Sequence, residues 1–251
     1  MAPDFVWLSR KTHETSVRIF AMEANQARIF RWGGGALGIG AAIYGFAIVA
    51  YVLLYGQPDA ANPDGIVTLS DRVRHLEANW NIAEAMWWFE TVAVLLLAFG
   101  SFILQHQACD QHNKVPPRIA WLTVAIGSIF LFMMYPLMLG GYPEAIGFFE
   151  NEPGLMAVLN SVAFFIFYVG NAVLFLGLGM AFTLGSTTTG GMRSWVTTTG
   201  AVLCLVGLVG MIGGLFGIGA MMVLAPFGVI ATILSSYLGY SIWRAGARPD
   251  Q

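Results

Sequence analysis

The chain has 251 residues, of which 57% are hydrophobic and only 10% are charged, whereas an average soluble domain has about 25% charged residues. This composition excludes an ordinary soluble domain and indicates a membrane protein. The formal net charge of −2 identifies no partner, and the sequence has no block of basic residues that would indicate nucleic acid binding.

Six apolar runs are long enough to cross a bilayer, which takes about 20 mostly apolar residues in a helix. They cover residues 33–55, 82–104, 119–140, 154–182, 196–216 and 219–243. The sequence therefore predicts an all-α polytopic membrane protein, in which six transmembrane helices form one bundle within the lipid bilayer.

Residues 1–32 precede the first run and combine charged with apolar side chains. Val17, Phe20 and Ala24 recur at helical spacing within this segment. Two interpretations are open: an amphipathic helix that lies in the inner membrane interface, or a helical lead-in to the first span.

Arginine lies close to tryptophan at four ends of the apolar runs: Arg31 with Trp32, Arg118 with Trp121, Arg193 with Trp195, and Arg244 with Trp243. Tryptophan is enriched at membrane interfaces, and basic residues are enriched in cytoplasmic loops. This arrangement predicts that both termini, including a short tail at residues 244–251, lie in the cytoplasm. We expect a bacterial inner membrane as the setting.

The loop between the first two spans is predicted from proline and glycine within residues 57–68. Ser70 then offers an N-cap for a short external helix. This helix leads into the second span, either continuously or with a slight break near residues 79–81. Pro153 predicts the start of the fourth span, because its missing N–H costs nothing in a first helical turn.

Two prolines fall inside predicted spans: Pro136 in the third and Pro226 in the sixth. Each removes a backbone hydrogen bond, so we expect a kink at both positions. Residues 216–219 contain two glycines and predict a tight turn, which makes the last two spans a helical hairpin.

Small residues recur at helical spacing on several spans: Gly34 and Gly38; Gly210, Gly213, Gly214 and Gly217; and Ala231, Ser235 and Gly239. Such faces let helix backbones approach closely in lipid. We expect them to pack neighbouring spans of the same chain. The alternative is a seam to a second copy or to another membrane subunit.

Glu84 and Glu90 are the two acidic or basic side chains inside the predicted spans. A charge in hydrocarbon costs several kcal/mol and usually faces a cavity or a partner. The two residues lie about 120° apart around the helix, so they do not form one site. We expect Glu84 to be interfacial and partly hydrated.

Glu90 is expected to be protonated and neutral if its surroundings are dry. Its predicted hydrogen-bond partners are Tyr135 on the third span and Asn160, Tyr168 or Asn171 on the fourth. One interpretation is a group that binds a proton or a solute; the other is a neutral carboxyl that fastens two helices.

Trp88 shares a helix face with Glu84 and belongs to a dense aromatic patch. A membrane-interface belt explains this patch, and a surface for a lipid, quinone or pigment is the alternative. His106, Cys109 and His112 have side chains that suit zinc or copper. Their spacing matches no strong metal motif, so we predict a solvated loop rather than a metal site.

Function is constrained mainly by what the side chains exclude. No span contains the lysine that retinal needs or the histidine pair that haem needs, and no nucleophile–base pair is visible. We therefore expect a protein that is not an enzyme, and the sequence assigns no cofactor.

Two hypotheses remain. The first, which the sequence slightly favours, is a non-catalytic accessory or scaffold subunit of a membrane complex. The second is a proton-linked transporter or ligand-binding protein in which Glu90 and Glu84 act with other polar residues of the spans: Tyr135, Tyr168, Asn171 and the neighbouring Trp88.

Overall fold

The computed structural model describes four stretches of backbone, namely residues 4–59, 66–110, 115–188 and 193–246. Side chains are described for residues 27–59, 66–106, 116–184 and 193–246. The helices are α1 (Asp4–Tyr55), α2 (Leu69–Ala78), α3 (Trp80–Asp110), α4 (Val115–Pro136), the π-helix η1 (Leu137–Gly141), α5 (Tyr142–Gly147), α6 (Pro153–Thr188), α7 (Ser194–Leu215), α8 (Gly219–Met222) and α9 (Ala225–Gly246). The described part of the chain contains no strand.

Six segments are long and apolar enough to cross a membrane: Ala27–Tyr55, Trp80–His106, Pro116–Gly147, Pro153–Leu184, Ser194–Leu215 and Gly219–Gly246. Each contains or nearly coincides with a run predicted from the sequence. The predicted fold class, a six-helix membrane bundle, is therefore confirmed.

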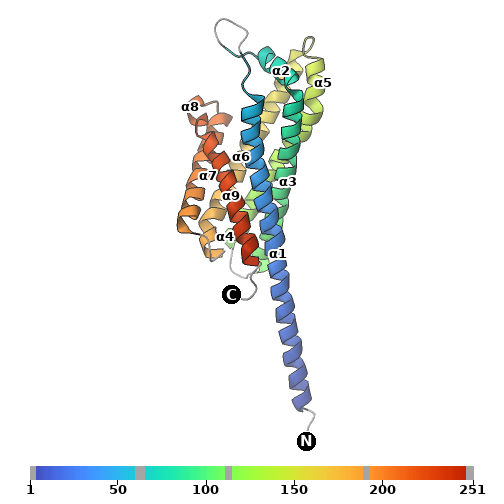
Figure 1. The fold of residues 1–251 in the computed structure, drawn as a ribbon, viewed down its shortest axis with the longest axis vertical. Helices are drawn as coiled ribbons and strands as arrows, with labels where there is room; N and C mark the ends of the chain where they lie inside the picture. Colours follow the sequence, from blue (N-terminus) through green and yellow to red (C-terminus); the bar gives the residue numbers. More distant parts are fainter. Residues whose placement is uncertain (1–3, 60–65, 111–114, 189–192, 247–251) are drawn as a thin grey trace.

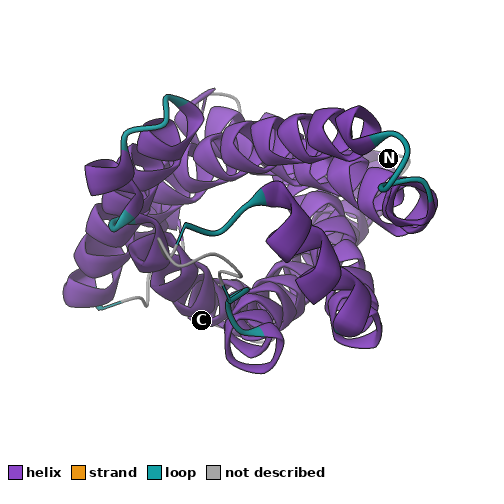
Figure 2. Cartoon of the chain, turned by 90° about the horizontal axis from the view of Figure 1, so that it is seen from above, coloured by secondary structure: helices purple, strands orange, loops and turns teal. Residues whose placement is uncertain are grey.

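The six spans form a closed ring. Each span packs against the spans before and after it in the chain, and α9 completes the ring by packing along α1. Figure 2, a view along the bundle, shows the helices arranged around a common axis. The order α1, α3, α4, α6, α7, α9 places α1 and α6 on opposite sides of this ring.

Glycines make the close contacts that join these helices. A Cβ added at Gly34 would overlap the backbone of α9, and one added at Gly239 would overlap the backbone of α1 at Gly38. Gly207 of α7 and Gly228 of α9 approach each other in the same way. The predicted small-residue faces on these helices thus pack within the chain, as close approach in lipid requires.

α1 runs without interruption from Asp4 into the first span, as the lead-in interpretation expects. Figure 1 shows its N-terminal part continuing well beyond the ends of the other helices. We call this end of the bundle, where α9 also ends at Gly246, the termini side. The opposite end, where α2 and α5 lie, is the α2 side (Figure 1).

The break between α2 and α3 is confirmed at Asn79. The predicted cap at Ser70 is wrong by two residues: Thr68 caps α2, and its hydroxyl accepts from the backbone N–H of Asp71. The Asp71 carboxylate accepts in turn from the backbone N–H of Thr68, which completes a capping box. Thr68 has the extended backbone that an N-cap needs, whereas Ser70 is already helical.

The two prolines behave differently. Pro136 ends α4 and leads into the π-helical turn η1, so a disturbance at this position is confirmed. The kink predicted at Pro226 is wrong, because the chain leaves the helix at residues 223–224 and Pro226 lies in the first turn of α9. Gly217, with φ at 69°, makes the predicted hairpin turn before α8.

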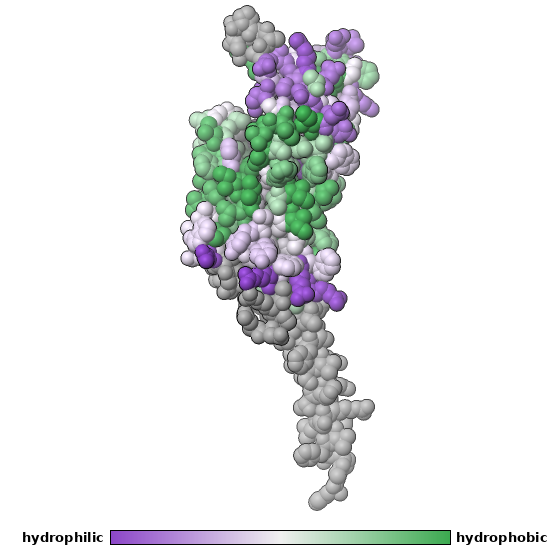
Figure 3. Space-filling view, viewed as in Figure 1, coloured by the Kyte–Doolittle hydropathy of each residue, from purple (hydrophilic) through white to green (hydrophobic). Residues whose placement is uncertain are grey.

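The outer surface is apolar around its middle and polar at both ends (Figure 3). Trp32, Trp195 and Trp243 are exposed on this surface at the termini side, as predicted for an interface belt. Trp121 is the exception: it is 9% exposed and belongs to the buried core. The prediction that it also lies in the belt is wrong, because its face of α4 is turned into the bundle.

Candidate functional site

Glu90 lies inside the ring. It occupies the inward face of α3 together with Trp87, Val94 and Leu97, which follow one another at helical spacing and are all buried. Only 7% of the Glu90 surface is exposed. The first turns of α3 place its carboxyl group about 15 Å from Trp80 along the helix axis, well within the membrane.

Glu90 belongs to a buried chain of polar groups that crosses the ring. Its Oε2 lies 2.9 Å from the hydroxyl of Tyr135 on α4. Tyr135 also lies within electrostatic range of Tyr44 on α1. Tyr44 donates to Oδ1 of Asn171 on α6 across 3.1 Å. We call these four residues the polar bridge.

The hydrogens of the polar bridge can be counted. Nδ2 of Asn171 donates to the carbonyl of Phe167 at 3.0 Å, so Oδ1 faces Tyr44 and can only accept. The single hydroxyl proton of Tyr44 is therefore used on Asn171. The hydroxyl proton of Tyr135 is directed at Oε2 of Glu90.

The hydrogen bond between Glu90 and Tyr135 can form in both states of the carboxyl group. An ionised Glu90 can only accept from Tyr135, whereas a protonated Glu90 can also donate and leave the hydroxyl proton of Tyr135 free for another acceptor. The state of one carboxyl group therefore decides how the hydroxyl proton of Tyr135 is used.

The ring interior differs above and below the bridge. Toward the α2 side, Tyr51 stacks on Tyr55 at 4.5 Å between ring centroids. Trp87 meets the rings of Trp80 and Tyr142 edge-on, each at 5.7 Å. These five residues, from α1, α3 and α5, form what we call the aromatic half.

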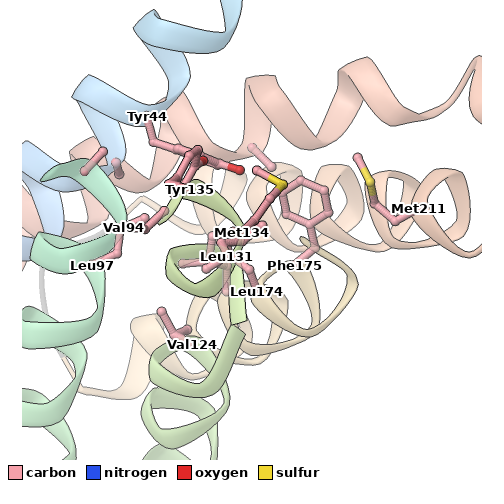
Figure 4. Close-up of a cluster of buried hydrophobic side chains, with 14 of the residues drawn as sticks. Tyr44, Val94, Leu97, Val124, Leu131, Met134, Tyr135, Leu174, Phe175 and Met211 are labelled. Atoms are coloured by element: carbon pink, nitrogen blue, oxygen red, sulfur yellow. The ribbon is translucent and has the colours of Figure 1, made fainter. Parts of the chain in front are cut away.

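Toward the termini side, the bridge rests on aliphatic side chains. Figure 4 shows Tyr44 and Tyr135 beside a layer formed by Val94, Leu97, Val124, Leu131 and Leu174. Each of these five side chains is fully buried. We call this layer the aliphatic half. None of its five side chains can carry a proton.

The spans supply no positive charge near Glu90. Residues 33–55, 82–104, 119–140, 154–182, 196–216 and 219–243 contain neither lysine nor arginine. The described arginines of the spans, such as Arg31 and Arg118, lie at the ends on the termini side and are exposed. An ionised Glu90 would therefore have no cationic side chain as its partner within the hydrocarbon region.

Of the predicted partners of Glu90, the structure brings Tyr135 into direct contact and Asn171 into the same bridge. Asn160 instead accepts from the Tyr142 hydroxyl at 3.0 Å. The Tyr168 ring lies against Gly214 of α7 and contacts Phe164 and Phe167, so it does not join the bridge.

Two other candidates lie away from the bridge. Trp88 is 55% exposed and points out of the bundle, which fits the belt interpretation rather than a place in this site. Glu84 is half-buried near the α2 side, as an interfacial role expects. His106 ends the second span, whereas His112 and the side chain of Cys109 lie outside the described residues.

Tyr44 was not among the residues predicted for the site, although a signal was present. Tyr44, Tyr51 and Tyr55 follow the spacing i, i+7, i+11 on the first span, which places three hydroxyl-bearing rings on one helix face. Trp87 belongs to the same aromatic patch as Trp88, which the sequence analysis placed at the surface. The sequence alone does not show which side of α3 faces the interior of the bundle.

Searches of protein-family models, curated proteins and solved structures found no match for this chain. The polar bridge and its surroundings are therefore interpreted from their own chemistry.

Proposed function

We propose that this protein is a proton-linked transporter or ligand-binding protein of the membrane, and that Glu90 takes up and releases the proton. The polar bridge carries this proposal, because it holds a buried Glu90 against the Tyr135 hydroxyl, with no lysine or arginine inside the apolar runs of the spans. Ionisable groups inside a membrane span are expensive and usually mark a functional site.

Fastening the helices would not need an acid. A glutamine at position 90 could donate to Tyr135 and leave the remaining links unchanged. What a carboxyl group adds is a proton that can leave. Its departure leaves a charge without a cationic partner, which costs several kcal/mol in a buried site. Proton release therefore favours a different arrangement of the side chains around Glu90.

The basic residues support an orientation for this activity. Arg31, Arg118, Arg193 and Arg244 lie at ends of spans on the termini side, and basic residues favour the cytoplasm. With this orientation, the aromatic half opens toward the outside of a bacterial inner membrane and the aliphatic half separates Glu90 from the cytoplasm.

Infrared spectroscopy of the purified protein in nanodiscs tests the proposal directly. We expect a band of a protonated carboxyl group that changes with pH in the wild-type protein and is lost in Glu90→Gln. Glu84→Gln is the matched control on the same helix and should keep the band. A spectrum in which Glu90→Gln removes no protonated-carboxyl band would reject the proposal.

An accessory or scaffold role is the second candidate, and the length of α1 favours it. Residues 4–26 of α1 precede the first span and correspond to about 35 Å of helix. Figure 1 shows this part outside the bundle, where another subunit has access to it. Co-purification from native membranes, with and without residues 2–26, tests this role; a protein that remains solitary in both forms would contradict it.

A further inference from the structure

We infer that the aromatic half of the ring binds an organic cation, and that this cation replaces the proton of Glu90. The inference rests on the proposed function, since it needs a Glu90 that exchanges its proton. It adds the chemical class of the ligand: an ammonium or phosphonium group that carries an apolar body.

The need for a counter-charge is the first argument. Once its proton has left, the Glu90 carboxylate is 7% exposed and has no lysine or arginine within the hydrocarbon part of the spans. A buried charge without a partner is strongly unfavourable. Glu90 contacts the neutral hydroxyl of Tyr135, whereas the titratable ring of His75 lies against Tyr55, with Nε2 2.8 Å from the Tyr55 carbonyl oxygen. The positive charge that balances Glu90 therefore comes from a ligand.

The aromatic half is the second argument. Tyr51 lies within electrostatic range of Glu90 and of Tyr142, and the Trp87 ring is in edge-on contact with the Tyr142 ring. Trp87 lies one helical turn from Glu90 on the same buried face of α3, so the aromatic half adjoins the carboxyl group on its α2 side. Aromatic faces attract cations, most strongly where water is excluded, and their apolar surface accommodates the body of an organic ion.

A metal ion fits these surroundings less well. The described residues contain no group of three or more histidine, cysteine, aspartate or glutamate side chains that could hold a metal. Calcium takes six to eight oxygen ligands and magnesium close to six, whereas the bridge provides one carboxyl, two phenols and one amide oxygen. An organic cation needs fewer oxygen ligands and gains more from aromatic rings.

The access side is set by charge and by packing. The described residues of the α2 side carry acidic side chains at Asp59, Asp71, Glu77, Glu84, Glu144, Glu150 and Glu152, against basic ones at Arg72 and Arg74 and the titratable His75. An acidic entrance attracts cations by long-range electrostatics. The aliphatic half blocks approach from the termini side, so both the ligand and the proton use the α2 side.

The exchange conserves charge. The O–H bond of the Glu90 carboxyl breaks, and its proton passes to water on the α2 side. The arriving cation then pairs with the carboxylate, while Tyr135 donates to Oε2 of Glu90. One positive charge leaves and one enters, so the interior remains neutral before and after the exchange.

Proton release upon cation binding is the measurement. Nanodisc-embedded protein in weakly buffered solution would receive tetraphenylphosphonium, and a pH-indicator dye would report released protons, with empty nanodiscs as blanks. We expect close to one proton for each cation bound. Tetraphenylborate, which has the same shape and the opposite charge, should release none, and sodium ions should release far fewer.

Two pairs of variants locate the site. Glu90→Gln should abolish proton release, whereas Glu84→Gln should not change it. Trp87→Leu should weaken cation binding about tenfold, in line with the loss of a desolvated cation–π contact, whereas the exposed neighbour Trp88→Leu should bind as the wild type does. The tryptophan pair remains informative if Glu90→Gln folds poorly.

Two outcomes would overturn the inference: no proton release with tetraphenylphosphonium, or equal binding by the two tryptophan variants. If sodium ions released as many protons as tetraphenylphosphonium, the ligand would be an inorganic cation, and the inference would be overturned as well. If the infrared band of Glu90 nevertheless responds to pH, the inference about the ligand is rejected and the proposed function stands. If that band is absent, both the inference and the proposed function are rejected.

Discussion

The two halves of the ring interior are lined by different types of side chain, although the same helices contribute to both. In the aliphatic half, α3 presents Val94 and Leu97, which the surrounding helices bury completely. In the aromatic half, α3 presents Trp80 and Trp87, and the Trp87 ring meets the Tyr142 ring edge-on. The difference is that the first half is lined by aliphatic side chains alone, whereas the second combines aromatic rings with polar hydroxyl and indole N–H groups. The polar bridge lies at their boundary.

The largest effect on stability is expected in the aliphatic half. Leu97→Ala should lower the free energy of unfolding by about 3 kcal/mol, because Leu97 is fully buried and its loss leaves a cavity. Leu95→Ala, on the exposed face of the same helix, should cost less than about 1 kcal/mol. Unfolding in mixed detergent measures both, and similar values would contradict the assignment of the inward face.

The next largest effect on stability is expected at the contact between α1 and α9, which closes the ring. Gly239→Ala should cost about 2 kcal/mol, because the added methyl group would overlap the α1 backbone at Gly38. Gly35→Ala is the control, since its Cβ would meet only a side-chain atom of Trp243 at an ordinary 3.6 Å. Thermal unfolding of the two variants should therefore separate them, with Gly35→Ala close to the wild type.

A smaller effect is expected at the boundary between the halves. Tyr44→Phe should cost about 1 kcal/mol, since it removes a buried hydroxyl and leaves Oδ1 of Asn171 without its donor. Tyr240→Phe removes a hydroxyl from an exposed tyrosine on α9 and should change almost nothing. If the two substitutions were equivalent in unfolding experiments, the polar bridge would not be formed as described.

The smallest effect on stability is expected for Glu90→Gln. The amide can donate to Tyr135 as a protonated carboxyl does, so the free energy of unfolding should change by less than about 1 kcal/mol. The infrared band and the proton release should nevertheless disappear. A large loss of stability would show instead that the carboxylate form holds the bridge together.

The sequence was sufficient for the six spans, because long apolar runs in lipid have few alternatives to helices. It also identified Glu90, Tyr135 and Asn171 from their type and depth. It could not decide which tryptophans face inward: Trp87 and Trp121 are buried, while Trp88 and Trp32 face outward. Rotation of a helix about its axis is set by its neighbours, and a uniformly apolar span does not reveal it.

Helix ends were predicted less well where a competing residue lay nearby. Thr68 rather than Ser70 caps α2, because Asp71 completes the capping box with Thr68. At Pro226 the prediction assumed one long helix, whereas the chain breaks just before this residue and begins again. In both cases the local hydrogen bonding of the backbone determines where the helix begins, and the amino-acid composition does not show this bonding.

The unbroken length of α1 has a mechanical consequence. Tyr44, the α1 member of the bridge, lies on the same rigid rod as Asp4, about 60 Å away along the axis. A tilt of only about 5° at Tyr44 would displace the far end by about 5 Å. Under the proposed function, a change of proton at Glu90 that tilted α1 would therefore produce a displacement of several ångströms at its N-terminal end.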